Sequence, residues 1–184
     1  MSKQPTLETE RLVLRPYTLD DAADVRRLAG DPVVADTALN IPHPYPEGAA
    51  EAWIGQHQGW FDAGEGVVYA VTLRATGELL GSVSMGINRK HNRAEMGYWI
   101  GKPYWNQGYA TEAVKRMIDF GFRDIGLHRI YSGCDIDNTA SKKVMENAGM
   151  RYESHWRKDR MRNGAWADGL GYAILDEDVR DSPE

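Results

Sequence analysis

Alternating polar and apolar positions predict strands in the first half of the chain. Residues Arg11 to Arg15 alternate strictly and end at a proline, which is typical of a short strand. A helix is expected next, beginning at Thr18 and running to Gly30, because threonine and acidic residues favour helix starts. Three further strands, which together would form a meander, are predicted at residues 67–73, 79–87 and 93–100.

Prolines interrupt the segment between the first helix and these strands. Residues 40–46 read Asn-Ile-Pro-His-Pro-Tyr-Pro. Each proline lacks an amide hydrogen and restrains the residue before it, so no regular element can form there. We expect a loop, followed by a helix from Glu47 to Trp60.

In the second half the period changes from that of a strand to that of a helix. Apolar residues at positions 110, 113, 114, 117, 118 and 121 predict an amphipathic helix, opened by a glycine-bearing loop at 105–109. A strand from His128 to Cys134 should follow, then a short helix capped by Asn138 and ended by Gly149. Four residues of that short helix should face inward: Ala140, Val144, Met145 and Ala148. Two final strands are expected around an Asn163-Gly164 turn.

The order of these elements predicts an α/β (mixed α+β) fold in one domain spanning residues 1–184, with its core at about 7–176. The sheet should be mostly antiparallel, with one central parallel pair created by the crossover from 93–100 to 128–134. Ligands bind outside the carboxyl ends of such strands, which is where the 105–110 loop must lie.

Composition excludes several classes of function. The 184 residues carry a net charge of −5, so we expect neither nucleic-acid nor membrane-surface binding. Cys134 is the only cysteine and the five histidines show no ligand spacing, so we expect no disulfide framework and no metal. The chain from Met1 to Pro5 lacks the apolar run of a signal peptide, and no stretch approaches the ~18 apolar residues of a membrane span. A cytoplasmic protein is therefore expected.

The loop before the amphipathic helix is a candidate phosphate site. The first amides of a helix have no partner within it, and the helix dipole adds positive charge there. Gly108 removes the side chain that would block a phosphate. The loop lacks both the Gly-Lys-Ser/Thr ending of a nucleotide P-loop and the three glycines of a dinucleotide site. By itself the glycine also fits a simple turn.

Four motifs, in matching order and at matching separations, resemble a known family over nearly the whole chain. They are Leu-Glu-Thr-Glu-Arg-Leu-Val-Leu-Arg-Pro at 7–16, Ala-Glu-Met-Gly-Tyr-Trp-Ile at 94–100, Tyr-Trp-Asn-Gln-Gly-Tyr-Ala-Thr-Glu-Ala at 104–113, and Asp-Asn-Thr-Ala-Ser at 137–141 with Asn-Ala-Gly-Met at 147–150. Together they resemble the GNAT superfamily, and more narrowly its RimJ/RimL branch of ribosomal-protein N-terminal acetyltransferases.

The resemblance implies a GNAT fold, with helices on both faces of a sheet that splays into a V between strand 95–100 and the strand ending at Cys134. Acetyl-CoA would enter this V, and no metal would be required. Asn138 and Ser141 would lie beside the pantetheine, which would pair with the backbone of Trp99 and Ile100, where a bulge would free an amide for the thioester oxygen. The pyrophosphate would bind the turn formed by Gln107, Gly108, Tyr109, Ala110 and Thr111.

The chain departs from the superfamily pattern at Met145, where many members carry a tyrosine that protonates the departing thiolate. Ser141, one turn earlier, resembles a serine that some RimL-like members place near the CoA sulfur, and it is our candidate donor. It also fits an exposed helix serine. Glu95 is our candidate base, expected to be buried beside the acceptor with its pKa raised; the alternative is a structural pair with Arg93.

The resemblance implies transfer of acetyl to a primary amine by direct attack in a ternary complex. The alternative is a CoA-binding sensor or structural domain. The acceptor could be a ribosomal-protein N-terminus or a small amine, chosen by the 40–46 loop, the 47–60 helix and the 160–166 hairpin. Tyr45, Trp53, Trp60 and Trp156 either line the acceptor cleft or belong to the core. Cys134 either approaches the CoA thiol or is a small buried residue. Monomer and homodimer both remain open.

Overall fold

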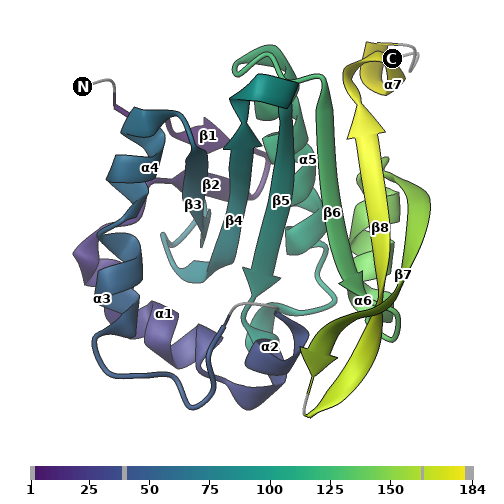
Figure 1. The fold of residues 1–184 in the computed structure, drawn as a ribbon. Helices are drawn as coiled ribbons and strands as arrows, with labels where there is room; N and C mark the ends of the chain where they lie inside the picture. The colour runs from purple at the N-terminus through teal and green to yellow at the C-terminus, as the bar shows by residue number, and fades with distance from the viewer. Residues whose placement is uncertain (1–2, 39–40, 163, 181–184) are drawn as a thin grey trace.

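The protein was analysed as a computed structural model that describes residues 3–38, 41–162 and 164–180. Within these residues eight strands form one sheet in the order β1-β2-β3-β4-β5-β6-β8-β7 (Figure 1). Every neighbouring pair is antiparallel except β5 and β6, which are parallel. The predicted mixed, mostly antiparallel sheet with one central parallel pair is confirmed. The strands are β1 Leu7–Glu8, β2 Leu12–Arg15, β3 Gly66–Leu73, β4 Leu79–Asn88, β5 Arg93–Ile100, β6 Arg129–Asp135, β7 Arg151–Arg162 and β8 Ala165–Leu175.

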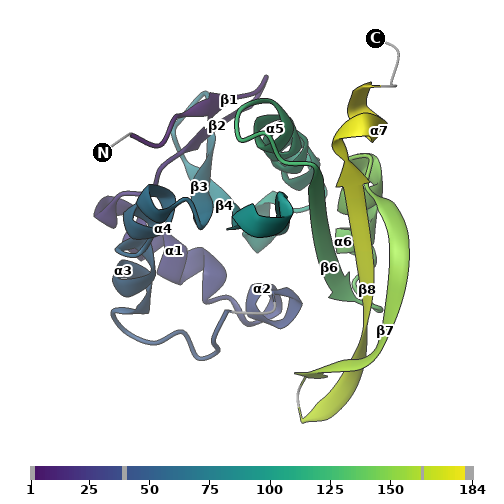
Figure 2. The ribbon, with the colours of Figure 1, turned by 45° about the horizontal axis from the view of Figure 1, so that its top comes forward.

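Helices cover both faces of the sheet (Figures 1 and 2). One face packs against α5 and α6 in the larger core, and the other packs against α1 and α3 in a smaller one. The alternation of strand side chains explains the two cores, because Tyr69 and Val71 belong to the first and Ala70 to the second. The helices are α1 Ala22–Ala29, α2 Pro32–Thr37, α3 Ala49–Ile54, α4 His57–Ala63, α5 Tyr109–Arg123, α6 Thr139–Asn147 and α7 Asp176–Arg180.

Three elements were not predicted, namely β1, α2 and α7, and each has six residues or fewer. The single helix expected at 47–60 is wrong: α3 ends at Ile54, Gly55 caps it, and α4 begins at His57. Glycine is a poor helix former, which accounts for the break. Ala140 is exposed rather than inward-facing, whereas Met145 is fully buried. Gly149 has the expected positive φ, at 89°. The Asn163 turn lies outside the described residues.

The two parallel strands separate soon after they meet. Residues Arg93–Glu95 of β5 pair with Arg129–Tyr131 of β6. The last link between the strands is the Ser132 hydroxyl, which donates to the Met96 carbonyl at 2.8 Å. Beyond it β5 continues to pair with β4, and β6 with β8. A V-shaped opening therefore divides the sheet at the carboxyl ends of both strands.

Candidate functional site

Backbone groups of β5 face the V without a strand partner. The Gly101 amide donates to the Leu80 carbonyl of β4 at 2.8 Å. Because successive residues of a strand point their amides to opposite sides, the amides of Tyr98 and Ile100 face away from β4 and into the V. The backbone of Trp99 faces β4, where it pairs with Ser82. All of β5 is described, and it pairs with β4 without a register shift, so the expected bulge is wrong. The separation of the strands, rather than a bulge, frees these amides.

The loop before α5 has the geometry of an anion site. Gly108 adopts a left-handed conformation with φ of 81°, which residues with a side chain rarely tolerate. The first helical bond runs from the Glu112 amide to the Gly108 carbonyl at 3.0 Å. The amides of Tyr109, Ala110 and Thr111 precede that bond and have no acceptor within the helix. At the positive end of a 15-residue helix, they can hold a phosphate.

The segment before β2 clamps this loop. The Arg11 guanidinium donates to the Gln107 carbonyl at 3.0 Å and to the Glu112 carboxylate at 2.7 Å, and it stacks over the Tyr109 ring at 4.7 Å. Burial alone would raise the pKa of Glu112, but hydrogen bonds from Thr9 and Arg11 outweigh it and lower that pKa. The clamp was not predicted, since its partners are about 100 residues apart in the chain. It fixes the loop and leaves a cation beside it.

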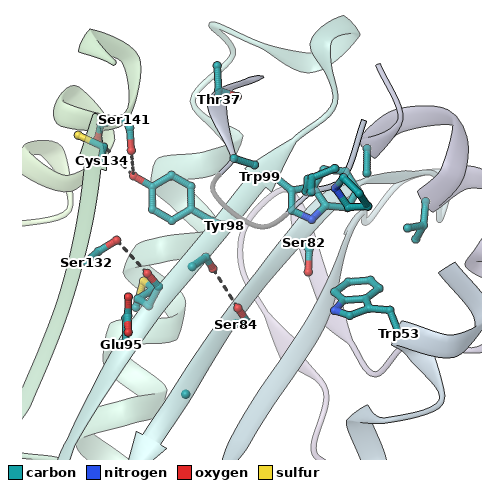
Figure 3. Close-up of a pocket in the computed structure, with 18 of the residues that line it drawn as sticks. Thr37, Trp53, Ser82, Ser84, Glu95, Tyr98, Trp99, Ser132, Cys134 and Ser141 are labelled. Atoms are coloured by element: carbon teal, nitrogen blue, oxygen red, sulfur yellow. Dashed lines mark hydrogen bonds between the residues drawn. The ribbon is translucent and has the colours of Figure 1, made fainter. Parts of the chain in front are cut away.

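A pocket of about 570 Å³ adjoins the V (Figure 3). Its floor is formed by β4 and β5. One wall comes from α1, the end of α2, the following loop and α3, and the other from β6 and Ser141 of α6. The residues that line it include Ile41, Pro42, Tyr45, Trp53, Ser82, Ser84, Glu95, Tyr98, Trp99, Cys134 and Ser141.

Glu95 lies on the floor of this pocket. Its side chain is exposed, so the expectation that it would be buried is wrong. The pocket is open enough at β5 for solvent to reach the carboxylate. The alternative partner, Arg93, places its guanidinium over the Tyr131 ring at 5.6 Å. Glu95 thus lines the pocket without the burial predicted for it.

Two hydroxyl groups meet across the V. The side chain of Tyr98 reaches from β5 to α6, where its hydroxyl shares a hydrogen bond of 2.7 Å with that of Ser141 (Figure 3). Burial raises the pKa of Tyr98, so the phenol stays protonated at neutral pH. Sequence reasoning missed Tyr98, because strand alternation places it on the face opposite Glu95. The contact joins residues 43 positions apart, for which no local signal exists.

Asn138 and Cys134 also lie close to Ser141. The Asn138 side chain accepts from the Ser141 amide at 3.0 Å, which confirms its role as the cap of α6. Cys134 is buried and also lines the pocket, and burial raises the pKa of its thiol.

Two of the four aromatic residues line the pocket and two do not. Tyr45 and Trp53 line the pocket, whereas Trp60 and Trp156 are not among its described lining residues. Trp156 instead lies close against Gly133 and Gly171, where a Cβ atom would approach its ring to about 2.5 Å. Of the two roles considered for these four aromatics, a place in the cleft therefore fits Tyr45 and Trp53 and does not fit Trp60 or Trp156.

Trp53 is held from behind by His57 and Tyr17. The Trp53 and His57 ring centroids are 4.4 Å apart in an edge-to-face arrangement, and those of Trp53 and Tyr17 are 5.1 Å apart. His57 is 6% exposed, and neither ring nitrogen has a hydrogen-bonding partner among the described residues. Burial lowers the pKa of His57 to about 4. The imidazole is therefore neutral at physiological pH.

Acidification is expected to destabilise the protein through His57. The unfolded chain binds a proton near the ordinary pKa of 6.5, whereas the folded chain binds it only near 4. The contribution of neutral His57 to the free energy of unfolding is therefore fully present above pH 6.5 and is lost as the pH drops toward 4. In urea titrations, the free energy of unfolding should fall about 2 kcal/mol further for the native protein than for His57→Leu between about pH 7.5 and about pH 5. Equal losses in both proteins would contradict this reading.

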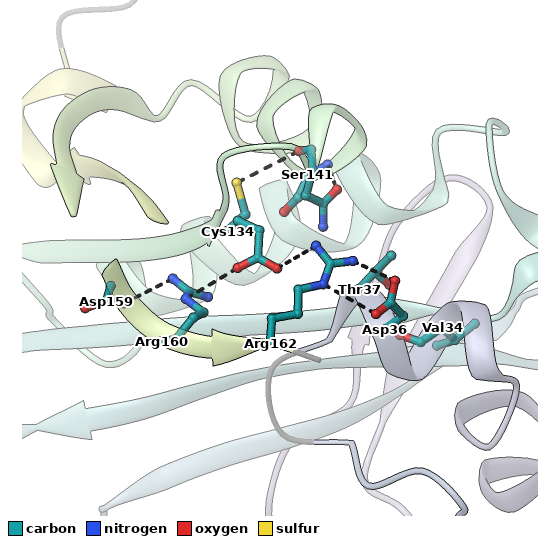
Figure 4. A network of polar contacts seen from close by, with 10 residues as sticks. Val34, Asp36, Thr37, Cys134, Ser141, Asp159, Arg160 and Arg162 are labelled. Carbon is teal, nitrogen blue, oxygen red and sulfur yellow. Dashed lines mark hydrogen bonds and ion pairs between the residues drawn. The ribbon is translucent and has the colours of Figure 1, made fainter. Parts of the chain in front are cut away.

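A polar network ties the β7–β8 hairpin to the pocket wall (Figure 4). The Arg162 guanidinium pairs with Asp36 of α2 at 2.6 Å and with the buried Asp135 of β6 at 3.0 Å. Arg160 lies 3.4 Å from the same Asp135. No described residue of the 160–166 hairpin is among the lining residues. The hairpin thus positions α2, whose last residue, Thr37, lines the pocket.

The part of the chain that the structure describes holds neither a metal-ligand cluster nor a membrane-spanning helix. Among residues 3–38, 41–162 and 164–180, no cluster of three or more His, Cys, Asp or Glu side chains could hold a metal ion. No helix in those same ranges is long and apolar enough to cross a membrane.

Comparison with known proteins identifies the family to which this fold belongs. The profile of the acetyltransferase (GNAT) domain matches residues 11–151. The N-acetyltransferase p20 of Bacillus licheniformis is 30% identical over 171 residues, covering 92% of this chain and 96% of its own. A GNAT-family acetyltransferase from Bacillus anthracis superposes with a TM-score of 0.83 at 28% identity, over 94% of this chain and 99% of its own. RimJ of Mycobacterium smegmatis, in complex with CoA-disulfide, superposes with a TM-score of 0.83 at 25% identity, over 97% of this chain and 89% of its own, and supports the RimJ/RimL resemblance. The chain belongs to the GNAT family of N-acetyltransferases.

Proposed function

We propose that this protein transfers the acetyl group of acetyl-CoA to a primary amine by direct attack in a ternary complex. One observation carries the proposal: the free amides at the start of α5, the unpaired amides of β5 and the pocket holding Glu95 all open onto the same V. The anion site fits the diphosphate, and the edge of β5 fits the pantetheine arm. The Glu95 carboxylate fits the ammonium of the acceptor.

Each end of the cosubstrate has a matching group. The amides of residues 109–111 would hold the diphosphate, and the Arg11 cation lies beside them. The amides of Tyr98 and Ile100 would bond the pantetheine arm or the thioester oxygen, as strand edges bind extended chains. A donor aimed at that oxygen stabilises the negative charge that develops there.

The chain can move both protons of the reaction. Glu95 would accept a proton from the acceptor ammonium, directly or through a water, since only the neutral amine can attack the thioester carbonyl. The new C–N bond forms as the C–S bond breaks. The Tyr98 and Ser141 hydroxyls would return a proton to the departing thiolate, a role that Met145 cannot perform. Glu95 and Ser141 thus keep their predicted roles as proposals, with Tyr98 added.

Removing one hydroxyl of the pair should slow turnover. We expect Tyr98→Phe and Ser141→Ala each to lower kcat about 10-fold, at the lower end of general-acid effects because the other hydroxyl or water remains. The double variant should lose far less than the product of the two, since the groups act as a unit. Tyr152→Phe, a change on the exposed surface of β7, is the control. Unchanged kcat in both single variants would remove the pair from the mechanism.

The experiment for the proposal itself follows both products. The protein is incubated with acetyl-CoA and a panel of small amines, polyamines and peptides with free N-termini, including those of ribosomal proteins. Thiol release should match the acetylated amine measured by mass spectrometry. Tight acetyl-CoA binding with no thiol release from any acceptor would favour the alternative, a CoA-binding sensor.

A further inference from the structure

The charge on the pocket lining restricts the acceptor. Among the described lining residues Glu95 is the only one with a charged side chain, and neither lysine nor arginine takes part. A polyamine carries several ammonium groups, and each would lose hydration without gaining a carboxylate. An acceptor that carries its own carboxylate would find no cation there. The lining therefore favours one positive charge and an uncharged body.

The floor of the pocket is flat and has few free polar groups. Away from Glu95 and Trp99, the floor is lined by Ser82, Ser84 and Gly86 of β4 and Gly97 of β5, so no large side chain rises from this part of it. The two serine hydroxyls already donate to backbone carbonyls, that of Ser82 to Tyr69 at 3.2 Å and that of Ser84 to Gly97 at 3.4 Å. Such a floor suits the face of an apolar or aromatic group rather than a chain of hydrogen-bonding groups.

Aromatic and aliphatic side chains form the wall opposite the V. Trp53, Tyr45 and Ile41 line this wall, and Trp99 stands on the floor about 13 Å along β5 from Glu95, four residues away. The edge-to-face contacts with Tyr17 and His57 fix the Trp53 ring. With a neutral imidazole behind it, the wall presents apolar surface without positive charge. Aromatic faces bind both apolar groups and nearby cations.

We propose that the acceptor is a primary amine with a single positive charge and an apolar, preferably aromatic, body. The inference rests on the proposed function and narrows it. The ammonium lies at Glu95 near the V, and the body extends over the serine floor to Trp53 and Trp99. Polyamines and free amino acids are poor acceptors, the first for lack of carboxylates and the second for lack of a cation.

Matched acceptors test the proposal. 2-Phenylethylamine, phenylalanine and spermidine are compared by kcat/KM at saturating acetyl-CoA. Phenylalanine differs from the first only by its carboxylate, and spermidine supplies additional charge without a ring. We expect 2-phenylethylamine to exceed both by at least about 10-fold, since an unpaired buried charge costs more than 1.4 kcal/mol.

Variants of Trp53 test whether this side chain contacts the body of the acceptor. Trp53→Ala should lower kcat/KM for 2-phenylethylamine about 10-fold while leaving the KM for acetyl-CoA unchanged, and Trp53→Phe should retain most of the activity. Trp166→Ala, on the exposed hairpin, is the control. Preference for spermidine or phenylalanine, or full activity in Trp53→Ala, would overturn the inference and leave the proposed function intact. Failure to acetylate any amine or peptide would instead overturn the proposed function.

Discussion

Replacing Gln107 by glutamate should raise the KM for acetyl-CoA by about 10–100-fold with little change in kcat. The substitution preserves size and adds one negative charge directly before Gly108, within the loop proposed to hold the diphosphate. Repulsion between that charge and a dianion bound by the same loop amounts to about a few kcal/mol at intermediate dielectric. Stability should fall only slightly: the exposed hydrogen bond from the Gln107 side-chain amide to the Pro103 carbonyl is lost, while an acidic group near a helix N-terminus is favourable when no anion is bound.

The control for this variant is Gln56→Glu, the same change at an exposed position between α3 and α4. Steady-state kinetics at varied acetyl-CoA, together with calorimetric CoA binding, measure the effect. It should weaken as salt is added, because exposed charges are screened. An unchanged KM for Gln107→Glu would place the diphosphate away from α5.

Replacing Glu95 by glutamine should lower kcat about 100-fold without weakening acetyl-CoA binding. Glutamine keeps the shape of the side chain but cannot accept a proton from the ammonium, and loss of a general base costs at least this much. Part of the rate should survive, because holding amine and thioester together accelerates the reaction without a base. Higher pH should restore some activity, since more of the amine is then already neutral.

Glu65→Gln, a change at an exposed carboxylate just before β3, is the matched control. The pH dependence of kcat separates a base from a structural residue, because a structural loss would be constant across pH. Equal kcat values in Glu95→Gln and the native protein would assign proton removal to water alone.

Strand β5, the loop before α5 and the cap of α6 were predictable because their signals are local. Strand β5 begins and ends where alternation predicted, at Arg93 and Ile100. The loop before α5 needed only a glycine before an amphipathic helix, and the Asn138 cap only an asparagine before a short helix. Short-range patterns of this kind are fixed by backbone geometry, so they can be read from the chain.

The contacts between distant segments were not predictable in this way. The Tyr98–Ser141 hydrogen bond crosses from β5 to α6, and the Arg11–Glu112 clamp joins the segment before β2 to α5. Neither pair has a spacing rule. The exposure of Glu95 was missed for the same reason, because burial depends on which elements cover the strand rather than on the strand itself.

The most direct test of the whole account is a crystal structure with coenzyme A bound. The account predicts the diphosphate within hydrogen-bonding distance of the amides of residues 109–111, and the pantetheine arm inside the V beside the backbone of Tyr98 and Ile100. The sulfur of coenzyme A should lie near the Tyr98 and Ser141 hydroxyls. Coenzyme A bound outside the V, or with its diphosphate away from the start of α5, would contradict the account.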